Sequence, residues 1–153
     1  MFRFKGLPAA PFARYAALSD SELAAMGARR VVADARPGFP CRVSLEDAER
    51  GERLILVNFE HQPACSPYRA CGPIFVREAA ATTFDGTDVP PVLRPRLLSL
   101  RAYDRAGLMV DADVIEGASV ETLLDRLFAN EETDEIHVHY ARRGCFACSV
   151  VRA

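Results

Sequence analysis

Short apolar runs separated by polar turns make up most of this chain, and their spacing is typical of β-strands rather than helices. Residues 54–59 are apolar at both odd and even positions except for Asn58, which predicts a strand buried on both faces. Further strands are predicted over residues 29–35, 73–78, 97–104, 108–115, 135–140 and 146–151. Most of the turns between them are too short for a crossover helix, which favours antiparallel pairing.

Two segments have helical signals. Ser19 and Glu22 match a capping box, and Gly27 is expected to end that helix. Ser119 is expected to cap a second helix, which carries one apolar stripe at helical spacing, formed by Val120, Leu123, Leu124, Leu127 and Phe128. We therefore predict a single globular α+β domain over residues 1–153, with a mostly antiparallel sheet of about five to six strands and two main helices packed on it.

The first candidates for chemistry are His137 and His139, in the predicted strand 135–140. Strand side chains alternate between faces, so the two imidazoles project from one face about 6.6 Å apart along the strand. Such a pair can bind a metal ion, share a proton or bind an anion. We treat both as candidate catalytic residues.

The connection over residues 61–72 contains two prolines and a glycine. Loops of this length are more often binding loops or disordered than simple connectors, and its aromatic and proline content argues against disorder. If the loop folds over the histidine face, His61 adds a proton donor or acceptor to the same pocket. His61 is therefore the third candidate catalytic residue.

Three neighbouring side chains are candidate ligand-binding residues, namely Tyr68, Arg69 and Arg77. A guanidinium group is a planar fork suited to binding an oxyanion with two hydrogen bonds. The structural alternative is that both arginines pair with nearby carboxylates such as Glu60 and Glu78.

A metal site is a further alternative, because histidine and cysteine are the usual ligands of zinc and related ions. Cys145 and Cys148 differ by an odd number of positions, so in a regular strand only one of them can join His137 and His139. A mixed site that includes His61 stays open. We assign no metal ligand and expect no cofactor, since a chain of 153 residues that is 50% hydrophobic can bury a core unaided.

Charge and composition limit the partners. The net charge of -2 and the lack of any long basic run exclude the usual electrostatic surface of a nucleic-acid-binding protein. No apolar run approaches the length of a membrane span, and prolines interrupt the first residues, so we expect no membrane partner and a cytoplasmic protein. Five cysteines cannot all pair within one chain, and we expect free thiols.

Two functional hypotheses follow. The first is a polar groove of histidines and arginines that binds a small anionic metabolite, with acid-base chemistry by a histidine. The second is a non-catalytic interaction or accessory domain in which the same side chains satisfy one another. The sequence sets neither the reaction nor the oligomeric state.

Several segments resemble the bacterial domain-of-unknown-function family 1203. They are residues 38–42, 66–69, 72–77, 110–114, His137-Val138-His139 and Gly144-Cys145. The resemblance extends from the first helix to the C-terminus. It implies no established activity, and Cys65 and Cys71 match none of its motifs.

Overall fold

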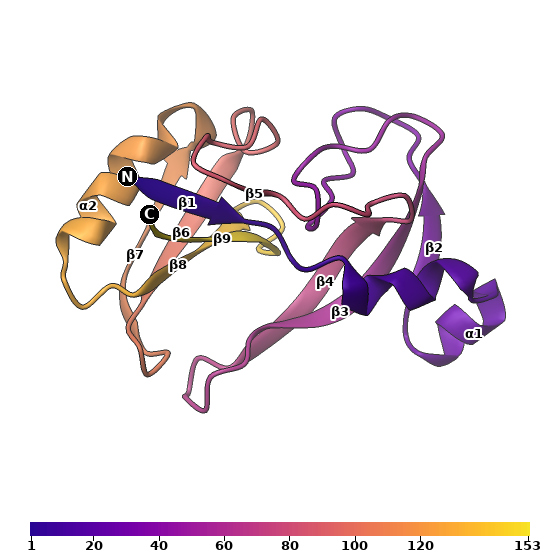
Figure 1. Cartoon of the computed structure of the whole chain (residues 1–153), viewed down its shortest axis with the longest axis horizontal. Helices are drawn as coiled ribbons and strands as arrows, with labels where there is room; N and C mark the ends of the chain where they lie inside the picture. The colour runs from indigo at the N-terminus through magenta and orange to yellow at the C-terminus, as the bar shows by residue number, and fades with distance from the viewer.

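The computed structural model describes residues 1–153 and contains two antiparallel sheets that lie side by side (Figure 1). The larger sheet has six strands in the order β5-β1-β9-β8-β6-β7, and the smaller has three in the order β2-β3-β4. The strands of the larger sheet are β1 (Phe2–Lys5), β5 (Asp85–Gly86), β6 (Leu97–Tyr103), β7 (Met109–Glu116), β8 (Glu135–Tyr140) and β9 (Phe146–Arg152). The strands of the smaller sheet are β2 (Arg29–Val32), β3 (Arg53–Gln62) and β4 (Ala70–Arg77).

The α+β class and the antiparallel pairing are confirmed, but the expectation of one sheet is wrong. Strands β2, β3 and β4 pair only with one another. Apolar alternation identifies a strand without identifying its partner, so the pattern could not separate the two groups.

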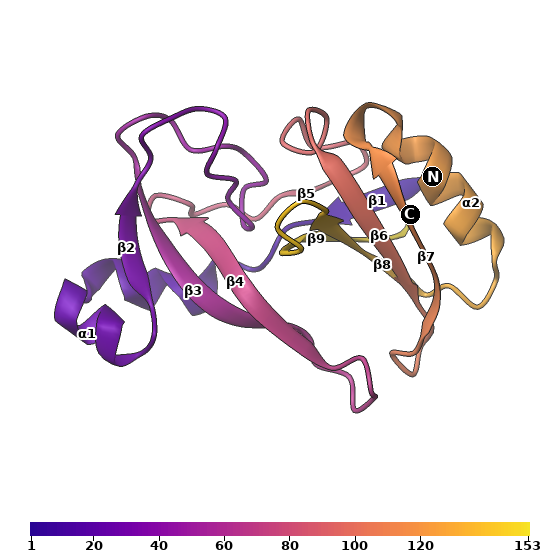
Figure 2. The ribbon, with the colours of Figure 1, turned by 180° about the vertical axis from the view of Figure 1, so that it is seen from behind.

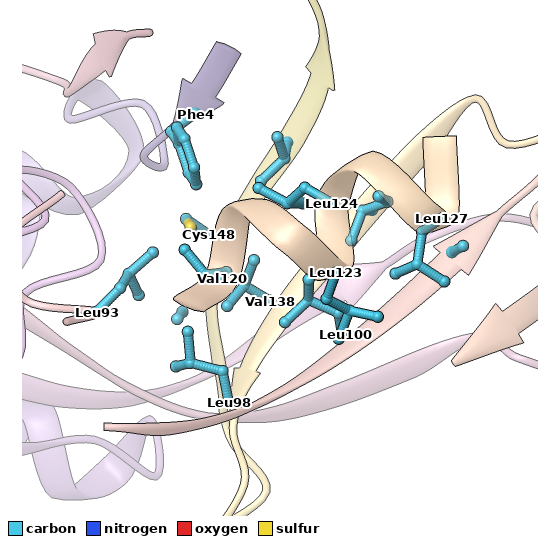
Figure 3. Close-up of a cluster of buried hydrophobic side chains, with 14 of the residues drawn as sticks. Phe4, Leu93, Leu98, Leu100, Val120, Leu123, Leu124, Leu127, Val138 and Cys148 are labelled. Carbon is cyan, nitrogen blue, oxygen red and sulfur yellow. The ribbon is translucent and has the colours of Figure 1, made fainter. Parts of the chain in front are cut away.

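Helix α2 (Val120–Ala129) covers one face of the larger sheet (Figure 3). A short 3-10 helix, η2 (Gly117–Ser119), leads into it, and the side chain of Ser119 makes no capping hydrogen bond, contrary to expectation. The predicted apolar stripe is buried in a core of 18 residues. Burying one such side chain stabilises by about 1.5–3 kcal/mol, which explains why the helix lies on the sheet. No helix of the structure has the length and apolar character needed to cross a membrane.

Helix α1 (Asp20–Ala25) follows the 3-10 helix η1 (Ala10–Ala17) and lies beside the smaller sheet (Figure 1). The predicted capping box is confirmed, because the Glu22 amide donates to Ser19 Oγ at 3.2 Å and the Ser19 amide donates to Glu22 Oε2 at 2.7 Å. Leu23 is fully buried in a second core of 10 residues. The two helices therefore pack on different sheets, and each sheet has its own core.

The β3–β4 hairpin reaches across to the larger sheet, and its tip lies beside the turn between β6 and β7 (Figure 2). Ser66 Oγ donates a hydrogen bond of 2.8 Å to the carbonyl oxygen of Gly107. Gly107 has φ +76, in the left-handed region that favours glycine, and a Cβ at this position would lie 2.2 Å from Cβ of Ala64. This close approach is possible only with glycine, and it brings the end of β3 against the larger sheet.

Candidate functional site

Three histidines, the only ones in the chain, converge between the two sheets. His61 comes from β3, whereas His137 and His139 come from β8. Each ring offers one ligand nitrogen, and these nitrogens all lie within 4.8 Å of one another. The three histidines thus lie together in the structure, as predicted.

His61 reaches this position from a strand and not from a loop. Strand β3 continues to Gln62 and β4 begins at Ala70, so the connection is shorter than the expected 61–72. The register between β3 and β4 shifts between Glu60 and Gln62. A β-bulge of this kind changes the direction of a side chain, and here it lies at His61 itself.

His137 and His139 share one face of β8, as strand alternation predicts, and both are buried. A register shift between β8 and β9 sets Phe146 opposite His139. The Phe146 ring stacks on His61 with centroids 5.3 Å apart and meets the other two imidazoles edge-on at 5.2 and 5.8 Å. Phe146 therefore packs against all three imidazoles.

One nitrogen of each imidazole is buried without a hydrogen-bond partner. These atoms are His61 Nδ1, His137 Nδ1 and His139 Nε2. The opposite nitrogen of two of the rings does have a partner. His139 Nδ1 lies 3.0 Å from the carbonyl oxygen of Gly144, and His137 Nε2 lies 3.4 Å from Glu135 Oε2. A buried nitrogen without a partner is unfavourable, so three at one point call for an explanation.

The contacts with Gly144 and Glu135 indicate which nitrogen of His139 and of His137 carries a proton. A carbonyl oxygen can only accept, so His139 Nδ1 carries the hydrogen and Nε2 carries the lone pair. The Glu135 carboxylate, 3.4 Å from His137 Nε2, can likewise only accept, so it favours a hydrogen on that nitrogen and leaves Nδ1 as the atom without a partner. The lone pairs are therefore on the two nitrogens that lack partners.

Burial keeps two of the rings uncharged. It lowers the pKa of His61 to about 4, and the charges of His137 and Arg101 act in the same direction. Burial also lowers the pKa of His139 to about 3, although the contact with Gly144 opposes the change. Both rings are neutral at pH 7, which is the form that binds metal ions.

The arrangement fits a divalent transition-metal ion. Three imidazole nitrogens with an open fourth position are a known catalytic zinc ligand set. Nitrogens bound to tetrahedral zinc at about 2.0–2.1 Å lie roughly 3.3 Å apart. The imidazole nitrogens lie within 4.8 Å of one another, so ring rotations that shorten these separations by about 1–2 Å would complete the site. The Gly144 carbonyl and the Glu135 carboxylate correspond to the outer partners that orient metal-binding histidines.

Neither cysteine of the C-terminal hairpin joins the histidines. Cys148 lies opposite Val138, is fully buried in the larger core, and has its pKa raised by burial to about 12. Cys145 Sγ accepts a hydrogen bond of 3.1 Å from the guanidinium of Arg42. The mixed histidine and cysteine site is thus not formed, and all five cysteines are free.

The three candidate ligand-binding residues do not form one site, because Tyr68 and Arg69 are adjacent in the chain whereas Arg77 is distant from both. The Tyr68 ring is 6.3 Å from that of Tyr103, which in turn is 4.9 Å from His137, so Tyr68 lies near the rim of the cluster. Arg69 pairs with Glu60 at 2.5 Å on the surface, as the structural alternative expected.

Arg77 is at the other end of the smaller sheet. It lies opposite Leu54 in the register of β3 and β4, seven residues from His61, which corresponds to about 23 Å of strand. Its guanidinium pairs with Glu52 at 2.7 Å and with Glu46 at 2.8 Å, and not with Glu78. The expectation that both arginines share one concavity with the histidines is therefore not met for Arg77.

Sequence reasoning missed Glu135 and Phe146 as parts of the site. Glu135 is two positions before His137, so strand alternation could have placed its side chain on the histidine face. Phe146 depends on the bulge in the β8–β9 pairing, for which the sequence offers no signal.

Comparison with known proteins gives a family and no activity. No curated protein and no solved structure matches the chain. A family model described as "Protein of unknown function (DUF1203)" matches residues 38–152, a range that includes all three histidines. The chain therefore belongs to the DUF1203 family.

Proposed function

We propose that this protein binds one divalent transition-metal ion, of the zinc class, through His61, His137 and His139. The proposal is carried by the geometry of the cluster: the three imidazoles offer nitrogens that lie within 4.8 Å of one another, and each ring also has one buried nitrogen without a hydrogen-bond partner. A bound cation would satisfy all three at once. Three histidine ligands leave a fourth position for water or a substrate, which is the coordination of catalytic rather than structural zinc.

The outer contacts support the same proposal. Structural histidines are commonly satisfied through both nitrogens. Here His137 and His139 each have a partner for one nitrogen only, Nε2 of His137 and Nδ1 of His139. Such partners hold the ring and make the other nitrogen a better ligand.

A histidine acid-base site that acts on an anionic metabolite is the second candidate. A general base works best with a pKa near the operating pH, and the pKa values of about 4 and about 3 for His61 and His139 lie far below it. Arg69 and Arg77, the cations expected to hold the anion, both have carboxylate partners. This candidate therefore has less support than metal binding.

Zinc titration of the untagged protein by calorimetry tests the proposal. We expect one binding event per chain and its loss in His61→Phe, which removes the ligand and keeps an aromatic ring to stack on Phe146. Circular dichroism in the presence of a chelator checks that the variant is folded.

Cys65→Ser with Cys71→Ser is the matched control, because both thiols are exposed and could bind zinc unspecifically. The double variant should bind zinc as the parent does. No binding by the parent, or unchanged binding by folded His61→Phe, would contradict the proposal and favour a non-catalytic accessory domain.

A further inference from the structure

A cavity of about 480 Å³ is lined in part by residues of the turn that follows β8, Arg142, Arg143 and Cys145. Four arginines line it, Arg42, Arg96, Arg142 and Arg143, and no carboxylate does. None of the three histidines lines it, so it is distinct from the proposed metal site. Four cations at one cavity are unexpected in a chain of net charge -2.

Arg42 is a buried cation with no opposite charge. Its side chain is 1% exposed. The guanidinium donates to the carbonyl oxygens of Phe146 at 2.7 Å and Pro40 at 2.5 Å, and to Cys145 Sγ at 3.1 Å. No carboxylate lies within ion-pair distance of it, although most other arginines of the chain have one. A buried charge without a counter-charge is costly, and an anion in the cavity would provide one.

Tyr140 lies between two of these arginines. The guanidinium carbon of Arg42 is 5.0 Å from the centre of its ring, and that of Arg96 is 5.3 Å away. The hydroxyl group is buried and has no hydrogen-bond partner. Burial raises the pKa of Tyr140, so the hydroxyl keeps its proton and can act as a donor. Arg96 also pairs with Asp47 at 2.6 Å, which holds it in place.

Arg142 and Arg143 add two further positive charges to the lining of the cavity. Both are exposed residues of the turn after β8, and neither forms an ion pair or a side-chain hydrogen bond. They are therefore free to contact a ligand.

Part of the lining is apolar. Phe39 and Phe75 pack with ring centroids 5.4 Å apart, and Pro40 and Leu97 lie beside them. A cavity that combines an apolar wall with a few convergent cations is typical of a small-molecule site.

We propose that this cavity binds a small molecule with an anionic oxygen group, a carboxylate or a phosphate, held by Arg42, Arg142 and Arg143, and with an apolar part against Phe39 and Phe75. Guanidinium groups match the geometry of both oxyanions. The Tyr140 hydroxyl gains a partner when the anion binds. The site lies outside the proposed metal centre and does not depend on it.

Phenyl phosphate, benzoate and the neutral benzyl alcohol are suitable probes, titrated against the chelator-treated full chain by calorimetry and by NMR. We expect saturable binding of one or both anions and none of the alcohol. Which anion binds distinguishes a phosphate from a carboxylate site. Binding of neither anion, or equal binding of the alcohol, would overturn the proposal.

Arg142→Gln with Arg143→Gln should weaken anion binding at least tenfold without affecting the fold, because both side chains are exposed. The matched control is Arg29→Gln with Arg50→Gln, which removes the same charge from exposed positions elsewhere and should bind as the parent does. Tyr140→Phe, which keeps the ring between the two guanidinium groups, should weaken binding severalfold. Equal affinity in the Arg142/Arg143 variant and the control would refute the assignment.

Discussion

Ser66 and Gly107 join the two sheets: the Ser66 hydroxyl donates a hydrogen bond of 2.8 Å to the Gly107 carbonyl oxygen, at the tip of the hairpin that carries His61. His61 is the only one of the three histidines that comes from the smaller sheet. The position of its imidazole therefore depends on how this tip contacts the β6–β7 turn.

Gly107→Ala should destabilise the protein by about 1–3 kcal/mol and weaken zinc binding. The new Cβ would lie 2.2 Å from that of Ala64, and φ +76 adds backbone strain. Thermal unfolding and zinc calorimetry measure the two effects. The control is Gly27→Ala, which has φ +71 and no atom within 4 Å of the new Cβ. Equal effects of both changes on zinc affinity would mean that the tip contact does not position His61.

Glu135→Gln tests the outer contact of His137. The carboxylate that lies 3.4 Å from His137 Nε2 is replaced by an amide, which orients the ring less strongly. We expect zinc affinity to fall about 10–100-fold, the usual effect of removing such a partner. Glu132→Gln, an exposed change in the preceding turn, is the control. If both variants retain the parent affinity, Glu135 has no part in the site.

The metal-free protein should lose stability as the pH falls from about 6.5 toward 4. The folded-state pKa values of His61 and His139, about 4 and about 3, lie below the ordinary 6.5. In that range the unfolded chain binds more protons than the folded one, so stability is fully present above pH 6.5 and is lost as the pH falls. Arg101, His137 and Glu135 are the other charged or titratable groups near these rings.

Urea unfolding with a chelator, at a series of pH values, measures this dependence. His61→Phe should flatten the curve between about pH 6.5 and 5.5, where ordinary carboxylates remain almost fully ionised. A variant curve parallel to that of the parent would contradict the buried, neutral state of His61.

Arg77→Ala should reduce stability by about 1 kcal/mol and leave zinc affinity unchanged. The side chain pairs with Glu52 and Glu46, and the Arg77 and Glu52 side chains are only 20% and 24% exposed. Urea unfolding and zinc calorimetry of the same sample check both parts. A loss of zinc affinity in the folded variant would restore the original idea of a site shared by Arg77 and the histidines.

Local sequence patterns identified most elements and part of the site. Strand parity placed His137 and His139 on one face, and the Ser19 capping box was confirmed. Strand β3 pairs with its neighbours in the chain, β2 and β4, but whether this group joins the remaining strands in one sheet depends on contacts far apart in the chain. The division into two sheets was therefore missed. Arg77 was expected beside the histidines, but the register of the β3–β4 hairpin sets it opposite Leu54, at the other end of the smaller sheet.

The arginine cavity was also missed. Arg42 belongs to an irregular segment near Pro40, and nothing in its sequence context indicates that it is buried. Its burial arises from contacts with Phe146 and Cys145, more than a hundred positions away.

Crystals grown with zinc, measured on both sides of the zinc absorption edge, would locate the metal ion itself. We expect one anomalous peak per chain at about 2.0–2.1 Å from His61, His137 and His139 nitrogens, with the His139 contact through Nε2 and its Nδ1 still facing Gly144. A zinc-soaked crystal with no peak at the three histidines, or with zinc bound only at Cys65 or Cys71, would contradict the proposed metal site.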